Sequence, residues 1–150
     1  DDGAVPTLPD LSGADGKIPR RRTMMAQILL ADDNPDITAM LGDYLTFKGH
    51  RMIIVEDGYA LSQKAAEHRP HLIITDIQMP GAYGSSAYQV LQKDTNTNKI
   101  PVIFMSAHPL EKIAAILPKD PKTRFIHKPI SLAALDALIA ELLPMGGYCP

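Results

Sequence analysis

Five polar residues of the sequence follow or end short apolar runs, and their types could perform chemistry together. In chain order they are Asp32 and Asp33, Asp76, Ser106 and Lys128. Clustered carboxylates repel one another, and a hard divalent cation such as Mg²⁺ or Mn²⁺ removes that penalty, since it prefers oxygen ligands. An aspartate can also attack phosphorus, while a metal, a lysine and a hydroxyl stabilise the charge of the transferred group. Phosphoryl transfer to an aspartate is therefore the chemistry that such a set could support.

Each of these residues also has an ordinary structural explanation. Asp33 precedes a predicted helix, where a negative charge is favourable, and Asp76 could form the turn before Pro80-Gly81. Lys128 could be a surface lysine, and serine is common at strand ends. Taken singly, the structural explanation is the more frequent one. The functional interpretation depends on all five lying at strand ends of one sheet.

The elements that must position these residues alternate between strand and helix. Apolar runs predict strands at residues 27–31, 51–55, 71–75, 100–106 and 123–128. Helical spacing and capping residues predict helices between Asn34 and Gly49, and at residues 58–68, 86–93, 110–117 and 131–143. Because the strands are continuously apolar, we expect an α/β fold with a doubly wound, five-stranded parallel sheet. Ligands of such sheets bind beyond the carboxyl ends of the strands, where the five polar residues lie.

The composition fits one globular domain. The chain has 150 residues, of which 45% are hydrophobic and 21% charged, and its net charge of −2 gives no reason to expect nucleic-acid or membrane partners. A single cysteine, Cys149, cannot form an internal disulfide, so we expect a cytoplasmic protein. We expect residues 1–23 to be a flexible tail, linker or leader, residues 24–144 to form the domain, and residues 145–150 to be a short tail.

Four motifs resemble those of the receiver domain of two-component response regulators. They are ILLADDN (28–34), LIITDIQMPG (72–81), IFMSAH (103–108) and FIHKP (125–129), in the family's order. The resemblance covers about residues 26–143 and implies the flavodoxin-like (βα)5 fold with strand order 2-1-3-4-5. One departure is Tyr83, which stands before Gly84 where the family often has an acidic residue.

The resemblance also implies roles for the polar residues. Asp76 corresponds to the phosphorylated aspartate, and Lys128 and Ser106 to the residues that contact its phosphoryl group. The implied Mg²⁺ ligands are Asp33, Asp76 and the backbone carbonyl of Gln78, with Asp32 acting through water. Ser106 and Phe125 correspond to the switch residues, and Pro129 to a cis-proline.

By the same resemblance, phosphorylation changes a partner-binding surface made by the fourth helix, fifth strand and last helix. The implied partners are a histidine kinase or histidine phosphotransfer protein and a downstream protein. The last helix is apolar nearly all round, so a homodimer through this surface is a further expectation. We expect a signalling protein that assists its own phosphorylation and dephosphorylation, either a single-domain regulator or a receiver from a longer protein such as a hybrid kinase.

Two alternative functions, each typical of another class of protein, stay open. A hydrolase with an aspartyl-phosphate intermediate needs two aspartates separated by one residue after the first strand, whereas Asp32 and Asp33 are adjacent. A flavin-binding domain needs a hydroxyl- or glycine-rich phosphate loop there, where Pro35 and Asp36 stand. Turnover of a phosphate ester would favour the first alternative, and a coloured protein the second.

Overall fold

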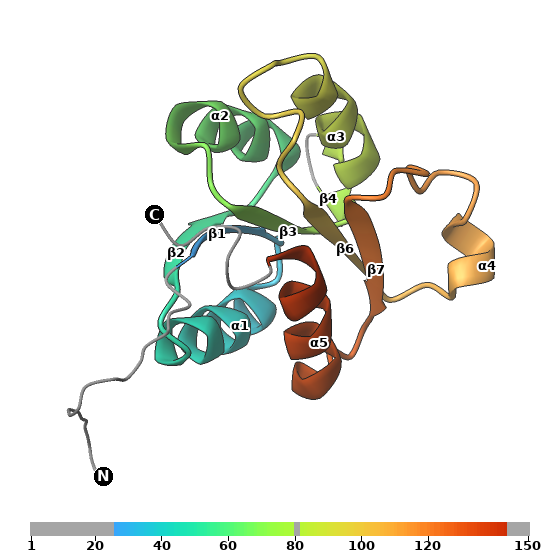
Figure 1. Ribbon diagram of the computed structural model, residues 1–150. Helices are drawn as coiled ribbons and strands as arrows, with labels where there is room; N and C mark the ends of the chain where they lie inside the picture. The colour runs from blue at the N-terminus through green and yellow to red at the C-terminus, as the bar shows by residue number, and fades with distance from the viewer. Residues whose placement is uncertain (1–25, 80–81, 144–150) are drawn as a thin grey trace, which may run out of the picture.

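The computed structural model describes residues 26–79 and 82–143 as alternating strands and helices (Figure 1). The predicted tails, residues 1–23 and 145–150, lie outside this part of the chain. The elements are β1 (Gln27–Ala31), α1 (Pro35–Phe47), β2 (Arg51–Val55), α2 (Gly58–His68), β3 (Leu72–Asp76), β4 (Gln78–Met79), β5 (Ala82–Tyr83), α3 (Gly84–Gln92), β6 (Val102–Ser106), α4 (Leu110–Ile113), β7 (Thr123–His127) and α5 (Leu132–Leu142). Among the described helices, none has the length and apolar character needed to cross a membrane.

The main sheet of the described residues has five parallel strands in the order β2-β1-β3-β6-β7. Since β6 and β7 are the fourth and fifth long strands of the chain, the predicted order 2-1-3-4-5 is confirmed. Helices α2 and α3 cover one face, α1 and α5 cover the other, and α4 lies beyond the β7 edge (Figure 1). All five strands therefore end at the same edge of the sheet.

Helix starts follow the predicted capping chemistry. The Asn34 side chain accepts a hydrogen bond from the backbone N–H of Asp36, and Pro35 occupies the first turn of α1. Ser131 caps α5 by accepting from the N–H of Ala134. Gly49 follows α1 with a φ of 101°, a left-handed conformation that suits glycine.

The core lies on both faces of the sheet because successive strand residues point to opposite sides. In β1, Leu29 contributes to the cluster under α2 and α3, whereas Ile28 and Leu30 contribute to the cluster under α1 and α5. All three are fully buried. The central strands thus form a rigid base for the residues at their ends.

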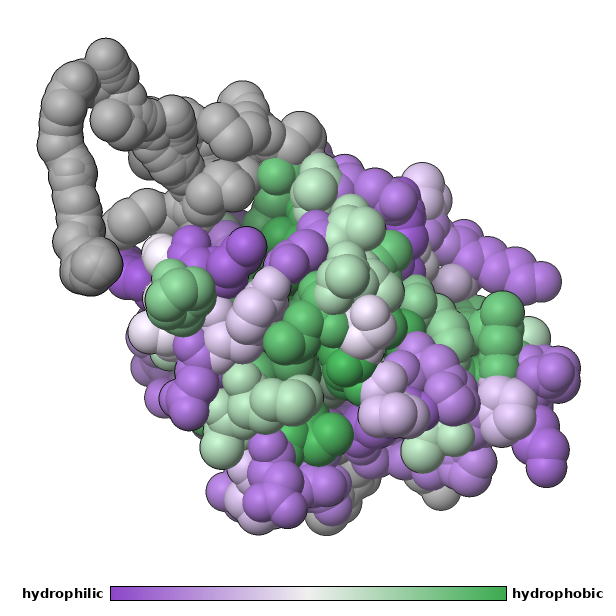
Figure 2. Space-filling view, turned by 90° about the horizontal axis from the view of Figure 1, so that it is seen from below, coloured by the Kyte–Doolittle hydropathy of each residue, from purple (hydrophilic) through white to green (hydrophobic). Residues whose placement is uncertain are grey.

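Some apolar residues of the last helix, α5, lie in the core and others lie at the surface. Leu135 and Ile139 are buried against the sheet, whereas the alanines of α5 lie outward; the exposed ones are Ala133, Ala134, Ala137 and Ala140. Figure 2 shows the face covered by α1 and α5, on which hydrophobic residues form a central band between hydrophilic ones. The interaction face expected on this helix stays a prediction.

Three local features differ from the sequence-based expectations. Helix α4 is a single turn, Leu110–Ile113, rather than residues 110–117, because so short an apolar segment before Pro118 gains little from helix formation alone. The outer strand β2 exposes Arg51 and Ile54, since an edge strand has a neighbour on one side only. The small hairpin of β4 and β5 was not predicted.

Candidate functional site

The carboxyl edge of the sheet brings the predicted site residues together. Asp32 and Asp33 follow β1, Asp76 ends the adjacent strand β3, Ser106 ends β6, and Lys128 follows β7. The strand register places Ala31 opposite Thr75, Asp76 opposite Met105, and Ser106 opposite His127. One carboxylate oxygen of each of Asp32, Asp33 and Asp76 lies within 4.8 Å of the others. The predicted acidic cluster is therefore present in the fold.

Lys128 bridges two of the three carboxylates. Its Nζ donates to Asp32 Oδ2 at 2.8 Å and to Asp76 Oδ2 at 3.0 Å. The side chains of Asp32, Asp76 and Lys128 are 0%, 13% and 16% exposed, so both ion pairs are largely shielded from water. Asp33, in contrast, is exposed.

The other oxygen of each bridged carboxylate is held by the backbone two residues further along. Asp32 Oδ1 accepts from the N–H of Asn34 at 2.9 Å, and Asp76 Oδ1 accepts from the N–H of Gln78 at 3.1 Å. Such Asx turns fix the carboxylate relative to its own strand end. Asp-x-Asn and Asp-x-Gln in the sequence are compatible with this arrangement but do not predict it.

Burial and charge act in opposite directions on the two central groups. Burial raises the pKa of Asp76, although the Gln78 N–H and the Lys128 ammonium counter it. For Lys128, burial favours the neutral amine, but hydrogen bonds to Asp32 and Asp76 outweigh burial and raise its pKa. Three carboxylates and one ammonium give a formal charge of −2, which matches a divalent cation. The oxygen donors of this cluster also suit Mg²⁺.

Ser106 links the site to the peptide that carries Lys128. Its hydroxyl is buried and accepts from the N–H of His108 at 2.9 Å, which leaves the hydroxyl proton available for donation. The carbonyl of Ser106 accepts from the N–H of Lys128 at 2.7 Å. The Lys128–Pro129 peptide bond is cis, as the resemblance implied.

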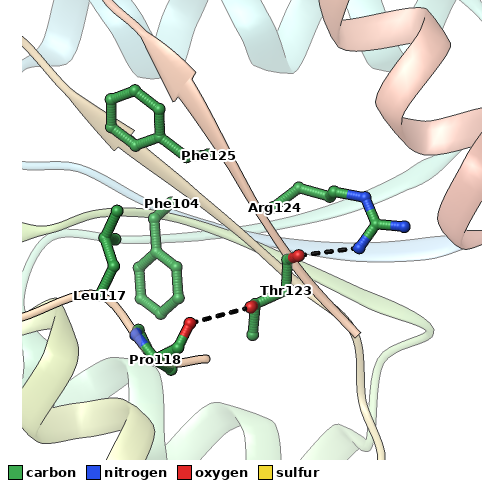
Figure 3. A pocket seen from close by; sticks show the side chains of 6 residues that line it. All are labelled: Phe104, Leu117, Pro118, Thr123, Arg124 and Phe125. Carbon is green, nitrogen blue, oxygen red and sulfur yellow. Dashed lines mark hydrogen bonds between the residues drawn. The ribbon is translucent and has the colours of Figure 1, made fainter. Parts of the chain in front are cut away.

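Phe125 lies on β7 next to a small pocket that the sequence did not predict. The pocket holds ≈ 140 Å³, and its lining residues are Phe104, Leu117, Pro118, Thr123, Arg124 and Phe125 (Figure 3). Phe125 is half-buried opposite Phe104 of β6, while the guanidinium of Arg124 points away to Glu141 of α5. The pocket therefore leaves space between Phe125 and residues 117–118, which follow α4.

The comparison with known families decides the classification. The family described as the response regulator receiver domain matches residues 28–140. The chain belongs to this family.

Similar proteins include PilH of Pseudomonas aeruginosa, 30% identical over 120 residues that cover 77% of this chain and 99% of PilH. DivK of Brucella anthropi is 28% identical over 80% of this chain and 98% of that protein. The sensor histidine kinase TmoS of Ectopseudomonas mendocina is 25% identical over 89% of this chain, which spans 14% of TmoS.

Solved structures agree with this classification of the receiver domain. The receiver domain of the sensor histidine kinase PA1611 from Pseudomonas aeruginosa superposes with a TM-score of 0.74 at 25% identity, covering 80% of this chain and 98% of that one. That structure has a magnesium ion coordinated in its active-site cleft. The chemotaxis response regulator CheY4 of Vibrio cholerae, 22% identical, has a TM-score of 0.70 over 80% of this chain and 100% of that one, and supports the fold alone. Receiver domains are signalling modules that interact with histidine kinases and downstream partners.

Proposed function

We propose that this receiver domain accepts a phosphoryl group on Asp76 from a phosphohistidine of a histidine kinase or histidine phosphotransfer protein. The observation that carries the proposal is the contact of Lys128 Nζ with both Asp32 and Asp76. It fixes a cation beside a partly buried carboxylate at the carboxyl edge of the sheet. A poorly hydrated carboxylate beside a fixed cation is suited to attack phosphorus and to stabilise the product.

The proposed step needs no further general base. A carboxylate oxygen of Asp76 forms the new P–O bond while the P–N bond of the phosphohistidine breaks, and the departing imidazole nitrogen takes up a proton. Lys128 remains beside the oxygens on which negative charge increases. Ser106 Oγ, at the end of the neighbouring strand, donates its hydroxyl proton to the phosphoryl group.

Mg²⁺ fits the acidic cluster, and we assign its ligands as Asp33, Asp76 and the backbone carbonyl of Gln78. Asp32 acts through water in this assignment, because its side chain is fully buried, whereas Asp76 is partly accessible and Asp33 is exposed. Bound Mg²⁺, or Mn²⁺ in its place, would supply positive charge to the phosphoryl oxygens.

The proposed output is a change of the surface formed by α4, β7 and α5. Ser106 moves toward the phosphoryl group, and Phe125 turns toward the space that Ser106 leaves. A downstream protein, or a second copy of the chain, then binds the altered surface. This is a local change in charge that selects between two packings.

The proposed unit comprises residues 24–144, acting in signalling rather than as a turnover enzyme. A cytoplasmic location is part of the proposal, and the single cysteine, Cys149, is compatible with it. The hydrolase alternative predicts continuous release of phosphate from a generic ester, whereas the receiver proposal predicts labelling that stops at one phosphoryl group per chain.

The test is phosphorylation by a small-molecule phosphodonor in the presence of Mg²⁺. Wild type is expected to gain one phosphoryl group, and Asp76→Asn none. The matched control is Asp43→Asn, an exposed aspartate on α1, which should be labelled like wild type. Label that persists in the peptide containing position 76 of Asp76→Asn would overturn the assignment.

A further inference from the structure

Two histidines lie at the amino edge of the sheet, opposite to the acidic cluster. His50 directly precedes β2 and His71 directly precedes β3, the two neighbours of β1. His50 Nδ1 accepts a hydrogen bond from the N–H of Ala26 at 3.3 Å, and His71 Nδ1 accepts from the N–H of Gln27 at 2.9 Å. Two consecutive amides at the start of β1 thus donate to imidazoles on opposite sides.

Ala26 and Gln27 are each held through both of their backbone groups. The carbonyl of Ala26 accepts from the N–H of Arg51 at 2.9 Å, and the carbonyl of Gln27 accepts from the N–H of His71 at 2.9 Å. The imidazoles therefore extend the hydrogen-bond ladder at the point where β2 and β3 begin. An imidazole nitrogen takes the place of the strand carbonyl that would otherwise accept the amide proton.

These bonds require neutral imidazoles with the proton on Nε2. An imidazole that accepts at Nδ1 has no proton there, and a doubly protonated imidazole has no acceptor left. His50 is only 7% exposed, so its protonation also places a charge in a shielded position. The charged groups around it are Lys48 at the end of α1 and Asp136 of α5, and Asp136 is itself bonded to Tyr44.

We propose that His50, together with the parallel contact of His71, forms a clamp on the start of β1 that protonation of His50 releases. When His50 gains its second proton, the bond to the Ala26 N–H is lost and the pairing between the first residues of β1 and β2 is weakened. Release occurs at the point where the preceding chain joins the domain, far along β1 from Asp32. The clamp therefore responds to acid independently of phosphorylation at Asp76.

The expected direction follows from proton linkage. Burial and the Lys48 ammonium lower the pKa of His50, and Asp136 opposes them without reversing the shift. The unfolded chain, whose histidine pKa is about 6.5, then binds more protons than the folded chain in the window below that value. The contribution of the clamp to the free energy of unfolding is complete above about pH 6.5. It decreases as the pH falls toward the pKa of His50 in the folded chain.

The test is amide hydrogen exchange at Ala26 and Gln27, followed by NMR between pH 7.5 and pH 5 and corrected for intrinsic exchange. Protection of the Ala26 amide in wild type should fall roughly five- to tenfold as His50 titrates, the effect of one lost hydrogen bond. His50→Asn keeps an acceptor that does not titrate, so its protection should be independent of pH. His50→Ala should be poorly protected at every pH, and His71→Asn should leave the pH dependence at Ala26 intact.

His68→Asn is the matched control, because His68 is an exposed histidine at the end of α2. It should reproduce the wild-type profile, and phosphorylation at Asp76 should be unchanged in all these variants. The proposal is overturned if Ala26 protection stays constant while His50 titrates. It is also overturned if His50→Asn keeps the wild-type pH dependence.

Discussion

Replacing Lys128 by methionine would remove the cation that bridges Asp32 and Asp76. At an effective dielectric constant of about 20, each ammonium–carboxylate attraction at these distances is worth about 5–6 kcal/mol, and desolvation of the lysine offsets much of the sum. Removing one partner of a buried pair typically costs about 3–5 kcal/mol. Because Asp32 stays buried without its partner, we expect Lys128→Met to lose about that much free energy of unfolding at pH 7.5.

The assay is urea unfolding in EDTA at pH 7.5 and pH 4.5. Burial raises the pKa of Asp76, and without Lys128 this pKa rises further above the unfolded value of about 3.9, so the variant loses stability as the pH rises from about 4 toward neutral. The deficit relative to wild type should therefore be smaller at pH 4.5. Lys112→Met, at an exposed lysine of α4, serves as the control and should stay within about 0.5 kcal/mol of wild type. A loss below about 1 kcal/mol for Lys128→Met, or an equal loss at both pH values, would refute the reasoning.

Three further outcomes are expected. Mg²⁺ at one hundred times its dissociation constant should raise the wild-type free energy of unfolding by about 2.7 kcal/mol, and in urea titrations Asp33→Asn should gain much less at the same concentration. Ser131→Ala removes the cap of α5 and should cost about 1 kcal/mol, measured by thermal unfolding, with Thr95→Ala in a loop as the comparison. Lys122, by hydrogen-bonding to Asp120, lowers the pKa of that carboxyl to about 2. The stabilisation of the folded chain by this ion pair is therefore present above about pH 4 and decreases toward about pH 2. In unfolding experiments, Asp120→Asn should lose less free energy of unfolding relative to wild type at pH 3 than at pH 7.

The sequence predicts the parallel sheet and the meeting of its polar strand ends for a simple physical reason. Uninterrupted apolar strands must be covered on both faces, and parallel strands end at one edge. Composition and periodicity do not specify which strands are neighbours. The order in which Asp32 and Asp76 become adjacent came from the family resemblance, and the structure confirms it.

Other features depend on geometry that residue patterns do not encode. The length of α4 depends on a small balance between helix formation and tertiary packing, and the apolar pattern of residues 110–117 overestimated it. The bridge from Lys128 to Asp32, rather than to Asp33, depends on which of two adjacent side chains turns inward. Likewise, the acceptor roles of His50 and His71 emerge only when three strands are placed side by side.

The two Asx turns give the carboxylates of Asp32 and Asp76 orientations that are settled by their own strand ends. Their rotamer entropy is lost when the domain folds, not when a phosphodonor arrives. The Ser106 hydroxyl is held in the same way, by the N–H of His108, whereas Phe125 is half-buried on β7 beside a small pocket. The cleft thereby combines preorganised polar groups at the strand ends with an adjustable aromatic side chain on β7. Substitutions that disturb the two Asx turns should change the rate of phosphoryl uptake, and substitutions of Phe125 should change the free-energy gap between the two packings.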